Sequence, residues 1–124
     1  MPRSARLRSG YQHAKVREGG TTLHGTFLRI GLFKPQDEDG AEVLGLEKFA
    51  TQGAVIVSRR IGSAVIRNKV KRRLREIYRH ELPRLKPGLW IVVTAKPAAA
   101  TTSLSTLRAE WLRLASRLSI FADS

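Results

Sequence analysis

The most restrictive feature of the sequence is a basic segment in its middle that also has helical apolar spacing. Residues 59–86 contain eleven lysine and arginine side chains, opposed there only by Glu76 and Glu81. A helix that starts after Gly62, with Ser63 as its N-cap, brings the apolar side chains of this segment within about a third of a turn of one another. These side chains are Ile66, Val70, Leu74, Ile77 and Tyr78. We therefore predict an amphipathic helix whose apolar stripe packs on a core and whose other side faces solvent.

The side of this helix opposite the apolar stripe is almost purely cationic. Its polar residues recur at i, i+4, i+7 and i+11, with lysines beside the row: Asn68, Arg72, Arg75 and Arg79, flanked by Lys69 and Lys71. Solvated helix faces usually mix charges of both signs, whereas here only Glu76, four residues after Arg72, is placed to relieve repulsion. A merely solvated face is the alternative interpretation, but the pattern favours a surface that binds a polyanion.

The charge of the whole chain also indicates a polyanionic partner. Its 124 residues include 23 Lys and Arg against 10 Asp and Glu, a formal net charge of +13, and a polyanion relieves such self-repulsion. Nucleic acid is the usual partner, and an anionic membrane surface is the rival. No run approaches the ~20 apolar residues of a spanning helix, and no apolar signal-like region follows the basic residues 1–8. We therefore expect a soluble, cytoplasmic protein with no membrane partner.

The remaining elements are predicted from apolar periodicity and from the glycines and prolines between them. We expect helices over 7–17 and 103–118, and strands over 26–33, 54–58 and 89–95. An extended loop covers 34–52, with a possible strand at 43–46, and holds five of the ten acids. The continuous apolar run at 89–95 is typical of a strand covered on both faces. The length is typical of one domain, and the chain has no cysteine, so we predict a single α/β domain over 1–124 with a flexible start at 1–7.

Side chains that often carry chemistry are scattered. His13, His24 and His80 are far apart in the sequence, and each fits an ordinary surface residue. The chain has no Gly-Lys-Ser/Thr phosphate loop and no zinc-ligand spacing. The acidic run at 37–39 consists of adjacent side chains, which converge poorly on one ion, so a solvated loop is the better interpretation. We therefore predict no catalytic residue and no metal site in the protein itself.

One continuous stretch resembles a known family. Residues 58–76 read Ser-Arg-Arg-Ile-Gly-Ser-Ala-Val-Ile-Arg-Asn-Lys-Val-Lys-Arg-Arg-Leu-Arg-Glu. This stretch is similar to the signature of the bacterial ribonuclease P protein component. In that family a strand ends in Ser and two basic residues, and a Gly-containing turn leads to Ala-Val and to the Arg-Asn-Arg segment of a basic helix. The apolar strand at 89–95, followed by Lys96 and Pro97, resembles the family as well.

The resemblance implies a particular fold. It implies a central sheet of about four strands with three helices, within the usual size range of a sheet. It also implies a left-handed crossover from the strand at 54–58, through the basic helix, to the strand at 89–95. Such connections are otherwise right-handed with few exceptions, so the hand of this crossover tests the resemblance independently of composition.

The resemblance also implies a function, that of the non-catalytic subunit of a ribonucleoprotein endoribonuclease. A partner RNA and its Mg²⁺ ions remove the 5′ leader from precursor tRNA, and the protein alone binds no cofactor. The implied RNA-binding residues are those of the basic segment: Arg59, Arg60, Arg67, Asn68, Lys69, Lys71, Arg72, Arg75 and Arg79. A cleft between the first helix and the sheet is implied to bind the leader, with His13, Arg17 and Phe27 as its residues.

The sequence departs from the family's pattern at three places. Lys69 stands where the second Arg of Arg-Asn-Arg is usual, which keeps the charge but loses the planar fork that binds phosphate bidentately. His13 and Arg17 stand where the first helix usually has aromatic residues. The loop at 34–52 is longer than is typical. The partners that we expect are the catalytic RNA and precursor tRNA, with no DNA partner. The alternative classes are a ribosomal or ribosome-associated protein, and a DNA-binding protein that places a helix in the groove.

Overall fold

The computed structural model describes residues 10–34, 51–86 and 88–121. The elements in chain order are α1 (Gly10–Gly19), β1 (Thr21–His24), β2 (Leu28–Phe33), β3 (Gln52–Ile56), α2 (Ala64–Glu81), β4 (Trp90–Ala95) and α3 (Leu104–Arg117). Short 3-10 helices also occur within these ranges: η3 (Arg59–Ile61), η4 (Leu82–Arg84) and η5 (Pro97–Thr101). No helix in the described ranges is long and apolar enough to span a membrane. The start at 1–7, the possible strand at 43–46 and most of the predicted loop lie outside the described residues.

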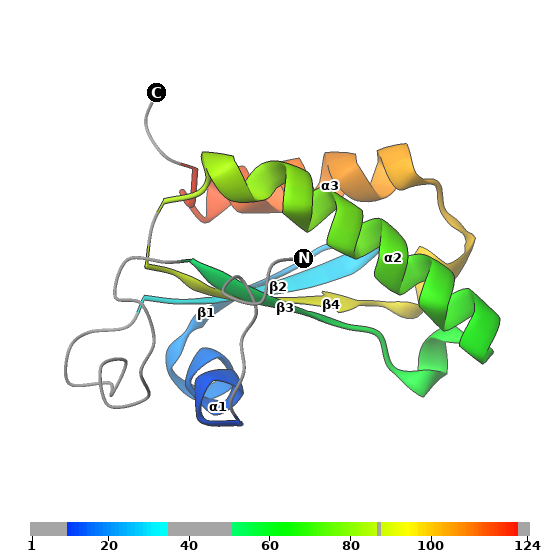
Figure 1. Ribbon diagram of the computed structural model, residues 1–124, viewed down its shortest axis with the longest axis horizontal. Coiled ribbons are helices and arrows are strands. Elements are labelled where there is room, and N and C mark those ends of the chain that lie inside the picture. Colours follow the sequence, from blue (N-terminus) through cyan, green and yellow to red (C-terminus); the bar gives the residue numbers. More distant parts are fainter. Residues whose placement is uncertain (1–9, 35–50, 87, 122–124) are drawn as a thin grey trace.

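The strands form one four-stranded mixed sheet in the order β1-β2-β4-β3. β2 is antiparallel to both β1 and β4, whereas β3 and β4 are parallel, with Gln52 opposite Trp90. Figure 1 shows α1 on one face of the sheet, and α2 and α3 on the other. The predicted α/β fold, with a four-stranded sheet and three helices, is confirmed.

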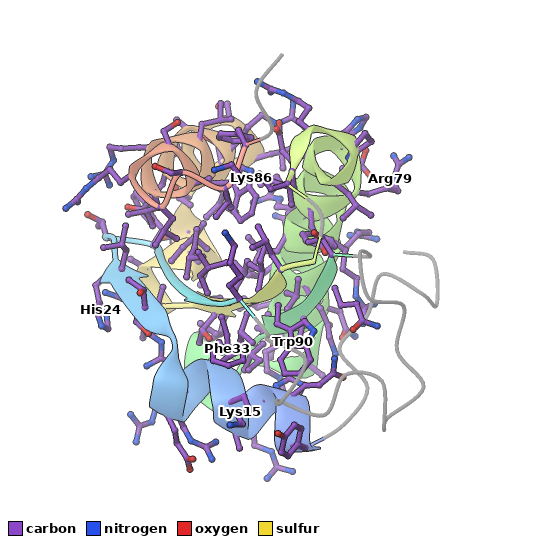
Figure 2. The ribbon with its side chains drawn as sticks, turned by 90° about the vertical axis from the view of Figure 1, so that its left-hand side faces the viewer. Lys15, His24, Phe33, Arg79, Lys86 and Trp90 are labelled. Atoms are coloured by element: carbon purple, nitrogen blue, oxygen red, sulfur yellow. The ribbon has the colours of Figure 1, made fainter. Side chains whose placement is uncertain are left out.

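The parallel strands β3 and β4 are joined by a crossover through α2. Both strands run from left to right in Figure 1, so they point away from the viewer in Figure 2. In Figure 2 the sheet runs from β1 at the left to β3 at the right, with α2 above β3 and β4. The chain therefore moves leftward from β3 to β4 by way of a helix above the sheet, which makes the crossover left-handed. This is the rare hand that the resemblance implies.

The core has two parts, one on each face of the sheet. The larger part lies between the sheet and the helices α2 and α3, where Trp111 of α3 and Ile91 of β4 are buried in one cluster. On the opposite face, Val16 of α1 packs with Trp90 and Val92. β4 therefore has buried side chains on both faces, as its continuous apolar run predicts.

Helix α2 begins and packs largely as its sequence predicts. The Oγ of Ser63 accepts a hydrogen bond from the backbone N–H of Ile66 at 3.4 Å, which caps the helix. The apolar stripe after the first turn is buried, at Val70, Leu74, Ile77 and Tyr78. Ile66 itself is 38 % exposed, so its predicted place in the core is wrong. It lies in the first turn, which projects past the strand ends in Figure 1, so the sheet does not cover it.

The β1–β2 hairpin is the main departure from the predicted elements. The strand predicted over 26–33 begins at Leu28, and β1 forms where no strand was expected. The carboxylate of Glu110, in α3, accepts the backbone N–H groups of Thr26, Phe27 and Leu28 at 2.6, 2.7 and 2.7 Å. A buried acid more than eighty residues away thus holds the turn, and local propensity could not reveal it.

A buried polar pair anchors α1 to the sheet. Gln12 is fully buried, and its Nε2 donates to Oε1 of Gln52 at 2.8 Å. Gln52 is the last residue of the predicted loop at 34–52 but is the first residue of β3, so the loop boundary is corrected here. The pair fixes α1 over the sheet on the face opposite α2 and α3.

Candidate nucleic-acid interface

The outer side of α2 carries cations around a shallow groove, which we call the α2 groove. It has a volume of about 410 Å³ and is lined by Asn68, Lys71, Arg72, Arg75, Glu76 and Arg79. Figure 2 shows Arg79 projecting from the side of α2 that faces away from α3. Because the opposite stripe of the helix is buried in the core, these side chains are held toward solvent.

The other predicted RNA-binding residues lie near the start of α2. Arg59 and Arg60 are exposed in η3, which is anchored by the buried Ile61. Arg67 is half-buried and Lys69 is exposed. These four cations do not line the α2 groove. They lie in η3 and in the first two turns of α2, near the helix N-terminus, where free backbone N–H groups also favour anions.

One carboxylate, that of Glu76, interrupts the cations of the α2 groove. Nη2 of Arg79 donates to its two oxygens at 2.9 and 3.0 Å, and Nε2 of His80 lies 2.8 Å from Oε1. The hydrogen bond from Arg79, and then the one with His80, hold the pKa of the Glu76 carboxyl below its usual value. From the sequence, Glu76 was expected to lie beside Arg72 and to reduce the repulsion between that arginine and its cationic neighbours. Among the described residues, however, the carboxylate pairs with Arg79 and His80.

A second groove, the α1 groove, lies between α1 and the sheet. Its volume is about 380 Å³, and it is lined by His13, Val16, Arg17, Thr22, His24, Arg29, Gly31, Ile56, Val92 and Thr94. A Cβ atom on Gly31 would lie 2.9 Å from Cγ1 of Val16, so a glycine lets the helix lie this close to the sheet. The structure thus brings together His13 and Arg17, two of the residues implied for the cleft.

Phe27, the third residue implied for the cleft, does not line the α1 groove. Its side chain is half-buried and packs against the main core, between the sheet and α2 and α3. The bond from its backbone N–H to Glu110 draws this turn toward α3, on the face opposite α1. The implied placement of Phe27 in the cleft is therefore wrong.

Arg29 and His24 line the α1 groove but were not predicted as site residues. Arg29 lies between Leu28 and Ile30, which are both buried in the main core. Because side chains alternate along a strand, this pattern alone could have placed Arg29 on the α1 face. His24 ends β1, a strand that was not expected, so no sequence signal placed it near His13.

Positive charge is what the two grooves share. Arg17 and Arg29 supply guanidinium groups to the α1 groove from a helix and from a strand. Guanidinium groups bind phosphates with charge-assisted, often bidentate, hydrogen bonds. No group of three or more His, Cys, Asp or Glu able to hold a metal ion occurs among the residues that the structure describes. The arrangement can therefore bind a nucleic-acid backbone at two separate places.

Comparisons with known proteins agree with one another. The family model for Ribonuclease P matches residues 1–119. The chain is 34 % identical over 118 residues to the ribonuclease P protein component of Acidothermus cellulolyticus, covering 95 % of this chain and 91 % of that protein. It is 41 % identical over 86 residues to the component of Salinispora tropica, covering 69 % of this chain and 61 % of that protein. The RNase P protein of Staphylococcus aureus has a similar structure, with a TM-score of 0.79 at 16 % identity over 95 % of this chain and 98 % of that chain. The RNase P protein of Thermotoga maritima has a TM-score of 0.72 at 24 % identity, over 90 % and 96 % of the two chains.

Proposed function

The chain belongs to the ribonuclease P protein family, and we propose that it assists a catalytic RNA in removing the 5′ leader from precursor tRNA. Membership sets aside the alternative of a ribosomal protein. Within the structure, the observation that carries the proposal is the row of solvent-facing cations around the α2 groove. The proposal includes a cytoplasmic location, and it includes no cofactor bound by the protein alone.

The α2 groove suits the backbone of a folded RNA. A-form RNA hides its base edges in a deep and narrow major groove, so proteins contact its phosphates and 2′-hydroxyls. Arg72, Arg75 and Arg79 recur three and four residues apart, which puts neighbouring side chains about 5–6 Å from one another. That spacing allows one helix face to contact a series of phosphates. We assign this face, with Arg59, Arg60 and Arg67 at its start, to the catalytic RNA.

The α1 groove suits a single strand of RNA. Arg17 comes from α1 and Arg29 from β2, so a strand lying between them can be contacted from both walls. His13 and His24 add hydrogen-bonding groups and flat rings to the same groove, and flat rings can stack on unpaired bases. We assign this groove to the 5′ leader of precursor tRNA.

In this proposal the RNA and its Mg²⁺ ions hydrolyse the phosphodiester, and the protein supplies binding. Its cations screen the repulsion between RNA phosphates, so the protein should matter most when Mg²⁺ is scarce. The test adds the purified chain to the ribonuclease P RNA of Acidothermus cellulolyticus, the source of a relative 34 % identical to this chain. Cleavage of precursor tRNA at low Mg²⁺ should rise, whereas the protein alone should cleave nothing above background. Specific 5′ cleavage by RNA-free protein, lost on a point change in the chain, would contradict the proposal.

A further inference from the structure

Glu76 is an acid in a groove whose charged residues are otherwise cations. It lines the α2 groove together with Lys71, Arg72, Arg75 and Arg79. A carboxylate at this place repels RNA phosphates and so weakens the attraction that the cations supply. Its side chain is 41 % exposed, so packing in the core does not account for its position. The contacts of its two oxygens indicate what it does there.

Both oxygens of Glu76 hold one nitrogen of Arg79. Nη2 of Arg79 donates to Oε1 at 2.9 Å and to Oε2 at 3.0 Å. A guanidinium has five N–H donors in a fixed plane, so this contact leaves the donors of Nη1 and Nε for another acceptor. Nε2 of His80 bonds the same carboxylate, at 2.8 Å from Oε1, and thereby restrains it from a second side.

We propose that Glu76 is a positioning residue that holds Arg79 with its free edge available to a phosphate of RNA bound in the α2 groove. The inference rests on the proposed function. Immobilising a long side chain at an interface lowers affinity by about two- to tenfold. An arginine that is already held by Glu76 loses less freedom when the phosphate arrives, so the acid favours binding in spite of its charge.

If Glu76 acted only through its negative charge, it would weaken RNA binding instead of favouring it. Glu76→Gln removes a negative charge from the groove, and in bulk water a unit charge about 8 Å from a phosphate changes affinity by roughly two- to threefold before salt screening. On charge alone the variant should therefore bind RNA slightly better. Positioning predicts weaker binding, so the sign of the change separates the two explanations.

The experiment measures the affinity of the full chain for the ribonuclease P RNA of Acidothermus cellulolyticus. The variants are Glu76→Gln, Arg79→Ala and the double variant, with Glu18→Gln on α1 as a control that changes the net charge by the same unit. Glu76→Gln should weaken binding by about two- to fivefold in the wild-type background. In the Arg79→Ala background it should strengthen binding slightly, because nothing is left to position. Glu18→Gln should not weaken binding, and thermal melts should show all variants folded.

Two results would overturn the inference. Stronger binding of Glu76→Gln in both backgrounds would show that the acid only repels RNA. Equal weakening in both backgrounds would show a role that does not pass through Arg79. Failure of the proposed function would be a different result, in which the wild-type chain binds this RNA no better than duplex DNA of the same length.

Discussion

Glu110→Ala should strongly destabilise the chain, because its carboxylate holds the β1–β2 hairpin that forms one wall of the α1 groove. Glu110 is 5 % exposed and accepts the backbone N–H groups of Thr26, Phe27 and Leu28. Its Oε1 also pairs with a guanidinium nitrogen of Arg113 at 3.0 Å. The alanine variant leaves all four groups without this acceptor.

The expected loss follows from how far water can replace the carboxylate. A buried N–H without a partner costs about 1–3 kcal/mol, and Leu28 is fully buried. Thr26 is exposed and Phe27 half-buried, so water reaches these positions and lowers the cost. The Arg113 side chain is 56 % exposed, so water can solvate its guanidinium when the carboxylate is gone, and loss of this ion pair adds about 0–1 kcal/mol. We therefore expect a loss of about 3–4 kcal/mol for Glu110→Ala, and about 2 kcal/mol for Glu110→Gln, which keeps one acceptor oxygen.

Thermal melts followed by far-ultraviolet circular dichroism measure this loss. In a domain of this size, about 3 kcal/mol lowers Tm by about 10–15 °C. Arg113→Ala is the matched control, because it removes the ion pair and leaves the three backbone bonds, and it should cost no more than about 1 kcal/mol. If Glu110→Ala lost no more stability than Arg113→Ala, the carboxylate would not be holding the hairpin, and the reasoning would be refuted.

Three further predictions concern packing, pH and the α1 groove. In urea titrations, Ile66→Ala should lower the free energy of unfolding by less than about 1 kcal/mol and Leu74→Ala by about 2–5 kcal/mol. The reason is burial, because Ile66 is 38 % exposed and Leu74 only 3 %. Equal losses in the two variants would contradict this prediction. Burial raises the pKa of Tyr78, so the folded state favours the neutral phenol and loses stability as the pH rises past the unfolded value of about 10. Tyr78→Phe should reduce this loss of stability at alkaline pH. It should leave stability at pH 7 unchanged, since the buried hydroxyl has no hydrogen-bond partner among the described residues. If the urea midpoint of the variant fell with rising pH as steeply as that of the wild type, the prediction would be wrong. Arg29→Ala should weaken binding of leader-bearing precursor tRNA more than binding of mature tRNA in filter assays, and equal weakening would remove Arg29 from the leader site.

Local signals were sufficient for the elements that depend on local physics. The cap at Ser63 and the period of 3.6 residues predicted α2, and its outer face followed from the same spacing. Ile66 shows the limit of periodicity, which indicates the direction of a side chain but not how far the sheet extends beneath it. The hairpin shows a second limit, because its turn depends on Glu110, which belongs to a helix at the other end of the chain.

The two grooves differ in how far sequence could predict them. The α2 groove is made by one helix, so the spacing of Arg72, Arg75 and Arg79 was enough. The α1 groove is assembled from α1 and several strands, and only the family resemblance indicated His13 and Arg17. To place His24 in this groove, the sequence would have had to predict β1. That strand has four mostly exposed residues and therefore no apolar alternation that would indicate it.

The salt dependence of RNA binding by Arg72→Ala tests the central claim, that the outer face of α2 binds RNA. Arg72 is exposed and has no ion pair among the described residues, so the change should cost only about 0–1 kcal/mol of stability. The affinity for ribonuclease P RNA should fall, and the log–log slope against salt should become shallower by about 0.7–0.9 for each phosphate that the variant no longer neutralises. Arg113→Ala, which removes a cation from α3, should leave the slope unchanged. An Arg72→Ala protein with wild-type affinity and wild-type salt slope would contradict the account.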